Sequence, residues 1–368
     1  MEFKINSKEF ENLLSKTVLV IPSHSTIETL EYFLFSIKNA NLIIQGTDST
    51  NIVSTEVDNF LDTGEDIEFL VPAKLLYDFV KSLGDKLITF KIEEDDNRIN
   101  ITFDNGEYNI SYLPKDEYHE MPVLNMDKVY AFDGKALKRA LELTNFAASQ
   151  DDIRPALTGI LFEFTEDGLN VVATDGHRLV KYTSLNIKNT TSEQFVIPGK
   201  AVSILMKSLT DAPVEITMNN SQMTFKLPGN TITTRIINEK YPNYNSVIPL
   251  QNEKLLTVNT KILQRAAKRS MLFGSQIKLN IETNLLVVSS DDSTRGRSAS
   301  EKILCQYGDE PMSIGFQADF LNEMLSHIES EDVIFKINQP TKAVIIKPSV
   351  CPEGEELLLL LMPIRLNS

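Results

Sequence analysis

The sequence has no long run of apolar residues and very few cysteines. None of its apolar runs reaches the roughly 18 residues of a membrane-spanning helix. The first residues, MEFKINSKEF, lack the apolar centre and the small-residue cleavage site of a signal peptide, so we expect a cytosolic protein. The two cysteines, Cys305 and Cys351, lie far apart and match no metal-ligand spacing, so neither a disulfide nor a zinc site is indicated.

Common catalytic motifs are also missing. Four histidines make a metal cluster hard to build, and there is no Gly-rich phosphate loop and no G-x-S-x-G nucleophile motif. Paired acids could suggest cation sites, but each pair is better explained as a turn or loop beside a strand. These pairs are Asp95-Asp96, Asp151-Asp152 and Asp291-Asp292.

The composition is that of a folded protein with more than one domain. The 368 residues are 42% hydrophobic and 24% charged, and this length favours two or three domains. The formal net charge of −15 argues against a protein that coats nucleic acid by bulk attraction. A local basic surface remains possible if the acidic residues are placed elsewhere.

Similar stretches recur along the chain. PAKLLYDFVKSL, PGKAVSILMKSL and FQADFLNEMLSHI each read as a short amphipathic helix followed by alternating, strand-like segments. Upstream of them, FKINSKEFENLLSK, YAFDGKALKRALEL and LTVNTKILQRAAKRS each read as a strand followed by a helix. The sequence therefore predicts six copies of one strand-helix-strands unit, two in each of three α+β domains, with a period of roughly 120 residues.

The spacing of apolar residues supports these assignments. Apolar residues alternate through 99–103 and 108–112, with Asp104-Asn105-Gly106 between them as a hairpin turn. In the first of the three similar stretches they fall at helical spacing and predict one apolar stripe. That stripe consists of Leu75, Leu76, Phe79, Val80 and Leu83.

Basic residues share one face of several predicted helices. In TKILQRAAKRS the cations are spaced i, i+4, i+7 and i+8, and three other helices have similar sets. In all, five of the six predicted helices carry Lys or Arg on the face away from the core. For a single helix, a solvated face is the simpler interpretation. Recurrence in an acidic chain favours a surface that faces phosphates without reading sequence. These cations are Lys261, Arg265, Lys268 and Arg269, then Lys135, Lys138 and Arg139, then Lys74 and Lys81, and then Lys200 and Lys207. The sixth helix departs from the pattern with Asp319 and Glu323.

The stretch ATDGHRLV at 173–180 raises the question of catalysis. Asp175, His177 and Arg178 could act as base, proton shuttle and anion clamp, or they could form a scaffold. An acid and a histidine two residues apart would need an unusual turn to form a hydrogen-bonded dyad.

Four motifs carry a resemblance to a known family. RPALTGILFEF from Arg154, VVATDGHRLV from Val171, RIINEKYPNYNSVIP from Arg235 and MPIRL from Met362 resemble the bacterial DNA polymerase III beta subunit, the replication sliding clamp. The resemblance covers the whole chain. It implies a non-catalytic subunit without a cofactor, located in the bacterial cytoplasm with the nucleoid.

The resemblance implies a particular assembly. A head-to-tail homodimer would close into a ring around duplex DNA, with helices lining the hole and sheets outside. The clamp loader, the replicative polymerase and repair proteins would be its partners. The implied domains are 1–122, 128–248 and 249–368, with linkers near YHEMPVLNMDK and YNSVIPLQNEK.

The resemblance also implies that ATDGHRLV belongs to a pocket for partner peptides. Apolar residues would receive an anchor side chain, with His177 and Arg178 as flanking donors, and a methionine in the wall would adapt to several partners. By motif match this peptide pocket consists of Leu157, Thr174, Gly176, His177, Arg178, Leu179, Pro242, Val247, Met362, Pro363 and Ile364. The residues Asn367-Ser368 extend past the family's usual end, beside this pocket.

Further positions follow from the same resemblance. His24, Gln150, Arg154 and Lys200 are expected to touch DNA, although the family more often has arginine at the place of His24. Leu272 and Phe273 are expected to pack near Tyr108 on the partner's edge strand. Two rival hypotheses stay open from the residues alone: an enzyme using Asp175, His177 and Arg178, and a repeat-built protein scaffold with no role on DNA.

Overall fold

A computed structural model describes residues 1–38, 41–57, 66–118, 122, 124, 125, 128–187 and 193–366. The chain divides into two compact units. The first contains Met1–Lys138 and Lys200–Ile236, and the second contains Arg139–Gly199 and Ile237–Ser368. This division passes through the predicted central domain.

The first unit contains two antiparallel sheets. A four-stranded sheet has the order β1-β6-β7-β8, and a nine-stranded sheet has the order β10-β15-β16-β17-β4-β3-β2-β5-β9. The strands are β1 (Glu2–Asn6), β2 (Tyr32–Lys38), β3 (Asn41–Thr47), β4 (Asn51–Val57), β5 (Ile67–Pro72), β6 (Leu87–Glu93), β7 (Arg98–Phe103), β8 (Gly106–Ser111), β9 (Leu113–Pro114), β10 (Lys128–Phe132), β15 (Val214–Met218), β16 (Gln222–Leu227) and β17 (Asn230–Arg235). The helical segments are α1 (Ser7–Thr17), η1 (Glu28–Glu31), α2 (Ala73–Ser82), η2 (Glu94–Asp96) and η3 (Lys115–Glu117).

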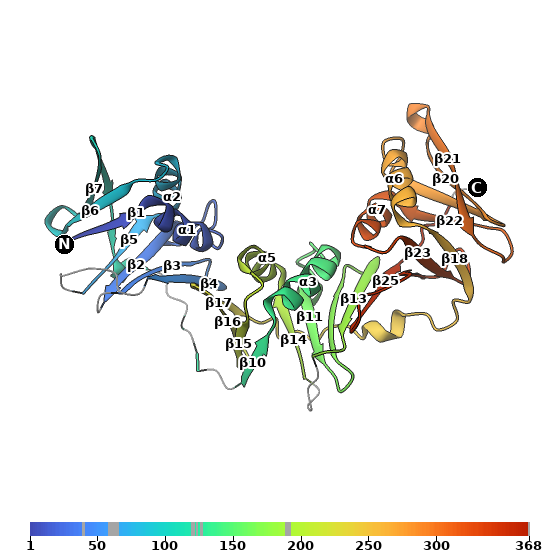
Figure 1. Ribbon diagram of the computed structural model, residues 1–368, viewed down its shortest axis with the longest axis horizontal. Coiled ribbons are helices and arrows are strands. Elements are labelled where there is room, and N and C mark those ends of the chain that lie inside the picture. Colours follow the sequence, from blue (N-terminus) through green and yellow to red (C-terminus); the bar gives the residue numbers. More distant parts are fainter. Residues whose placement is uncertain are drawn as a thin grey trace. The chain divides into compact units, whose positions relative to one another are not determined.

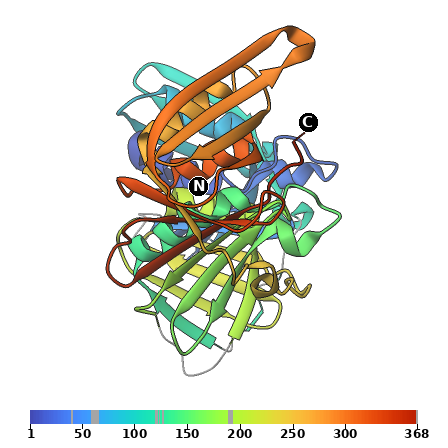
Figure 2. The same ribbon diagram turned by 90° about the vertical axis from the view of Figure 1, so that its right-hand side faces the viewer.

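The second unit is built on one antiparallel sheet of twelve strands, in the order β14-β11-β12-β13-β25-β24-β23-β18-β21-β20-β19-β22. Its strands are β11 (Gly159–Phe164), β12 (Leu169–Thr174), β13 (Arg178–Ser184), β14 (Glu193–Pro198), β18 (Lys254–Asn259), β19 (Gln276–Glu282), β20 (Leu285–Asp292), β21 (Arg297–Gln306), β22 (Met312–Gln317), β23 (Asp332–Ile337), β24 (Val344–Pro348) and β25 (Glu355–Leu361). The helical segments are η4 (Asn145–Ala147), α4 (Pro155–Thr158), η5 (Tyr244–Val247), α6 (Thr260–Ser270), η6 (Ser293–Arg295) and α7 (Ala318–Ser326). Figure 2 shows β20 and β21 as a long hairpin, drawn in orange.

Along the chain, two helices contain a boundary between the units. They are α3 (Gly134–Thr144) and α5 (Gly199–Ser208). All six predicted helices are therefore present, as α1, α2, α3, α5, α6 and α7.

The first helix of each repeat pair begins in the same way. The Asn6 side chain accepts a hydrogen bond from the Lys8 amide at 2.9 Å, and that of Asn259 accepts one from the Ile262 amide at 3.1 Å. The Asp133 carboxylate accepts one from the Ala136 amide at 2.8 Å. A side-chain oxygen at this position satisfies an amide that the helix itself leaves unpaired. The three caps mark equivalent points in the three repeat pairs.

Hydrogen-bonded ladders explain why the units do not follow the predicted domain borders. Strand β17 pairs with β4, so a strand of the predicted central domain continues a sheet of the first domain. Strand β13 pairs with β25 along Arg178–Ser184, which joins the other half of the central domain to the third. The sheets are therefore continuous across the borders that the sequence suggests.

Paired helices cover the sheets on one side. Helices α1 and α2 lie side by side, with α1 against β3 and β4 and α2 against β2 and β5 (Figure 1). In the second unit α6 and α7 form a similar pair, with α7 against β22 and β25. The apolar stripe predicted for α2 is correct except at one position. Leu76 is 1% exposed, but Leu75 is 56% exposed and so lies outside the buried face of the helix.

We predict opposite outcomes for two neighbouring leucines of α2. Leu76→Ala should lower the free energy of unfolding by about 2–5 kcal/mol, because it leaves a cavity in the core. Leu75→Ala, the control, should change it by less than about 0.5 kcal/mol. Urea unfolding followed by circular dichroism measures both values, and equal losses would contradict the placement of the helix face.

Candidate functional site

The turn between β12 and β13 holds the ATDGHRLV motif in a defined shape. The Asp175 carboxylate accepts hydrogen bonds from the amides of His177 at 2.8 Å and Arg178 at 2.9 Å. The Thr174 hydroxyl donates to the Arg178 carbonyl at 2.6 Å and accepts from the Gly176 amide at 3.1 Å. Gly176 has a φ of 92°, which disfavours any residue with a side chain. The motif is thus a tight turn stabilised by its own side chains.

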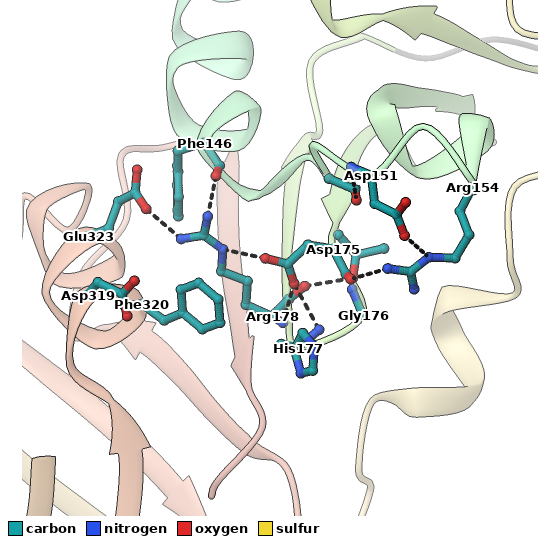
Figure 3. A network of polar contacts seen from close by, with 12 residues as sticks. Phe146, Asp151, Arg154, Asp175, Gly176, His177, Arg178, Asp319, Phe320 and Glu323 are labelled. Atoms are coloured by element: carbon teal, nitrogen blue, oxygen red, sulfur yellow. Dashed lines mark hydrogen bonds and ion pairs between the residues drawn. The ribbon is translucent and has the colours of Figure 1, made fainter. Parts of the chain in front are cut away.

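The Arg178 side chain is buried at the centre of a polar network (Figure 3). Its Nε donates to Asp175 at 3.0 Å, one terminal nitrogen to Glu323 of α7 at 2.6 Å, and the other to the Phe146 carbonyl at 2.7 Å. The guanidinium carbon also lies 4.5 Å from the ring centroid of Phe320 and 5.5 Å from that of Phe146. Hydrogen bonds and aromatic faces together compensate the burial of this charge.

This network changes the interpretation of two residues in the motif. The Asp175 carboxylate bonds the main chain of His177 and the Arg178 side chain, so an Asp175–His177 dyad is not formed. All three guanidinium nitrogens of Arg178 already have protein acceptors, and only 8% of the residue is exposed. Arg178 therefore holds protein segments together in this structure, and its expected contact with a peptide stays a prediction.

An apolar cluster lies beside this turn and contains two of the predicted pocket residues. Leu157 and Leu179 are buried there with Tyr241, Tyr244 and Leu360. Three other predicted pocket residues, Pro242, Val247 and Met362, are exposed. The structure thus supplies buried leucines next to exposed apolar side chains, and the identity of the peptide pocket stays a prediction.

The C-terminal residues of the predicted pocket are held at two points. The Met362 amide donates to the His177 carbonyl at 2.9 Å, and the Ile364 amide donates to the Gly315 carbonyl of β22 at 2.9 Å. Pro363 lies between these two attachments. The extension Asn367-Ser368 lies outside the described residues.

Some of the predicted DNA-facing cations have carboxylate partners that the sequence did not indicate. Arg139 pairs with Glu355 at 2.7 Å and with Glu329 at 3.0 Å. The hydrogen bonds from Arg139 hold the pKa of Glu329 below its usual value. Glu329 is 190 residues and Glu355 is 216 residues away in sequence, so no local pattern could have revealed them.

Three further cations are paired in the same manner. Arg269 pairs with Glu301 at 2.5 Å, Arg154 with Asp151 at 3.3 Å, and Lys200 with Asp48 at 2.5 Å.

The remaining cations differ in their surroundings. Lys138 is half-buried. The exposed cations are Lys74, Lys81, Lys135, Lys207, Lys261, Arg265 and Lys268. Of the expected loop contacts, His24 and Gln150 are also exposed.

The residues of the predicted subunit seam are accessible. Tyr108 lies on β8, the edge strand of the four-stranded sheet, and its ring stacks on Phe103 at a centroid distance of 5.6 Å. Leu272, 73% exposed, and Phe273 follow α6. They line a hollow that also includes Asp292, Arg295 and Arg297. Each side of the predicted seam thus presents an accessible aromatic or apolar group.

The paired acids and the cysteines show no sign of a metal site or a disulfide in the described part of the chain. Asp95 and Asp96 lie in η2, and Asp291 and Asp292 end β20. Within the described ranges, no three histidine, cysteine or acidic residues gather as a metal site would require. Cys305 and Cys351 are free thiols. No helix in the described part of the chain is long and apolar enough to span a membrane.

The repeated strand-helix-strands units and the cations on their helices are features expected of a DNA clamp. Family models for the N-terminal, central and C-terminal domains of the DNA polymerase III beta subunit match residues 1–122, 131–243 and 245–365. The chain belongs to this family of bacterial sliding clamps.

Known relatives match over almost the full length. The beta sliding clamp of Staphylococcus epidermidis is 26% identical over 378 residues, covering 99% of each chain. That of Pseudomonas aeruginosa is 26% identical and covers 100% of each. Solved structures of the Pseudomonas aeruginosa beta subunit and of a Bartonella birtlesii clamp bound to griselimycin cover 100% of both chains, with TM-scores of 0.92 and 0.91 and identities of 25% and 26%.

Family membership confirms several expectations. The fold is the α+β clamp fold, and the protein is a DNA sliding clamp that tethers the polymerase during replication. The family is a non-catalytic part of the polymerase holoenzyme, so the enzyme hypothesis and the scaffold hypothesis without a DNA role are both wrong.

The Lys200–Asp48 pair predicts a pH dependence of stability. Burial raises the pKa of Asp48, but hydrogen bonds from Lys200, Asn51 and the Thr50 amide outweigh it and hold this pKa below its usual value. The resulting stabilisation is complete above the unfolded-state pKa of about 3.9 and is lost as pH falls through the folded-state pKa.

We therefore expect Asp48→Asn to be less stable than the native chain by about 1 kcal/mol at pH 7. The difference should shrink below about pH 4. Melting curves of both chains between neutral and acidic pH measure this difference, and a gap that stayed constant through the acidic range would count against the pair.

Proposed function

We propose that the chain works as a head-to-tail homodimer that closes into a ring around duplex DNA and is loaded by a clamp loader. In this proposal each protomer supplies three domains, bounded at 1–122, 128–248 and 249–368. The ring binds no particular sequence and stays on DNA because it is closed. It acts in the bacterial cytoplasm with the nucleoid.

The main support for the proposed DNA contact is the basic face of α6. Lys261, Arg265 and Lys268 are exposed there, and no described residue forms an ion pair with them. In a chain of net charge −15, a face of this kind favours phosphate. Contacts to phosphate position a duplex without reading its bases. A few exposed cations therefore suit a protein that must slide.

Two open strand edges support the proposed seam. Within the described chain, strand β8 pairs on one side with β7 and has no strand on its other side. Strand β21 pairs with β20 along its length but meets β18 only at Cys305 and Gln306, which leaves one side of its first part unpaired within the described chain. Open edges readily accept another strand. We assign the seam to β8 of one protomer and β21 of its partner, with Tyr108 near Leu272 and Phe273.

The peptide pocket is the proposed site for the polymerase, the clamp loader and repair proteins. The exposed Met362, Val247 and Pro242 would surround an apolar anchor, with Leu157 and Leu179 beneath. His177 is exposed and can offer its ring to the peptide. A methionine at the surface suits several partners because its unbranched chain adapts to their shapes.

We expect Met362→Ala to weaken binding of a fluorescein-labelled peptide carrying the polymerase's clamp-binding motif by at least about tenfold. The dimer should persist, because Met362 is not part of the proposed seam. Fluorescence anisotropy measures the affinity and sedimentation measures the assembly. Val350→Ala, which truncates an exposed apolar residue outside the pocket, is the control. Loss of the dimer together with peptide binding would contradict the pocket assignment.

A topological experiment tests the ring. The protein is loaded on a nicked circular duplex with the organism's clamp loader and ATP, the complex is isolated, and the circle is cut once. We expect the protein to leave the linear DNA, because a closed ring slides off an end. Retention after cutting would mean that the cations hold DNA directly, and the ring proposal would be wrong.

A charge reversal tests the DNA contact separately. Reversing Lys261, Arg265 and Lys268 to glutamate should strongly reduce the amount of protein loaded on the circle, because α6 would then repel phosphate. Unchanged loading would remove α6 from the proposed DNA contact.

A further inference from the structure

We propose that Arg178 is a positioning residue for the peptide pocket: its contact with Glu323 fixes Met362, Pro363 and Ile364, which we call the C-terminal wall. The proposal rests on the proposed function of that pocket. In this role Arg178 acts through its three hydrogen bonds within the protein, to Asp175, Glu323 and the Phe146 carbonyl.

The C-terminal wall is attached first to the strand that carries Arg178. Strand β25 runs along β13, with Leu361 opposite Arg178. Directly after this pair the Met362 amide donates to the His177 carbonyl at 2.9 Å. The wall therefore begins at the residue next to Arg178.

The second attachment lies on a different segment. The Ile364 amide donates to the Gly315 carbonyl of β22 at 2.9 Å, and Leu366 also lies against Gly315. A Cβ atom at Gly315 would lie 2.6 Å from Leu366 Cδ2 and 3.0 Å from Ile364 Cγ1. Because Gly315 has no side chain, the C-terminal wall can pack directly against β22.

The Arg178–Glu323 contact fixes the distance between these two attachments. Strand β22 ends at Gln317 and α7 starts at Ala318, so β22 and Glu323 belong to one continuous segment. Arg178 joins that segment to the turn through a bond of 2.6 Å to Glu323 and through the Phe320 ring face. Figure 3 shows the arginine between α7 and the turn. If this contact is lost, β22 can shift relative to His177, and the wall with it.

Glu323 is the best position for a test. It is half-exposed and outside the peptide pocket, and its loss leaves Arg178 paired with Asp175. Glu323→Gln therefore removes the charge from the contact without leaving a buried arginine unpaired. Asp319→Asn is the matched control, because Asp319 lies on the same helix and is exposed. Its only hydrogen-bond partner among the described residues is the neighbouring Phe320 amide.

The experiment measures the affinity of the full-length protein for the fluorescein-labelled clamp-binding peptide by anisotropy. We expect Glu323→Gln to bind about three- to tenfold more weakly, and Asp319→Asn to bind as the native chain does. In hydrogen exchange, the Met362 and Ile364 amides of Glu323→Gln should exchange faster while the melting temperature stays near the native value. In a Met362→Ala background, Glu323→Gln should have little further effect, because the wall residue it positions is already truncated.

A second variant disturbs the wall from its other attachment. Gly315→Val should also weaken peptide binding and speed exchange at Ile364, because its side chain would displace Leu366 and Ile364. Gly308→Ala is its control, since no atom lies within 4 Å of the added Cβ.

The outcomes separate the two proposals. If the native chain fails to bind the peptide, the pocket assignment is wrong. If the native chain binds and Glu323→Gln binds equally well with unchanged exchange at the wall, the positioning role of Arg178 is wrong.

Discussion

The buried guanidinium of Arg178 is the constraint on which the site depends. Removing an arginine from water costs several kcal/mol unless its hydrogen bonds and charge are matched, on the order estimated for buried ions. Here the match comes from the β12–β13 turn, the carbonyl of Phe146 and a carboxylate of α7. These three segments must therefore lie where the arginine can reach them all, and the residues proposed to receive peptides lie on or beside them.

Pairing with carboxylates also reduces the positive charge that the helices present to DNA. Several cations that the sequence places on helix faces or beside them are paired with carboxylates: Arg139 with Glu329 and Glu355, Lys200 with Asp48, and Arg269 with Glu301. A paired cation attracts phosphate less than a free one, since its carboxylate repels the same phosphate. The attraction between these helices and DNA is therefore weaker than the number of lysines and arginines suggests. A weak attraction suits a clamp that must slide along DNA.

The sequence predicted the parts of the fold that depend on local patterns. Helices and strands followed from apolar spacing, but the stripe predicted for α2 was wrong at Leu75, which is 56% exposed. The turn in ATDGHRLV also had a local signal, because aspartate followed by glycine favours such turns. The role of Arg178 had none. Its partner Glu323 is 145 positions away, and only the folded chain brings the two together.

The continuous sheets have a consequence for the integrity of the chain. The strand β25 of the predicted third domain is bonded to β13 along Arg178–Ser184, and Arg139 and Arg178 add ion pairs to the same neighbouring region. The segment around Leu250 links the predicted second and third domains in sequence, and the Leu250 side chain is 97% exposed. If a protease cut the chain there, the two fragments would stay bound to each other. Two fragments expressed separately, one ending and the other beginning at this position, would be expected to associate.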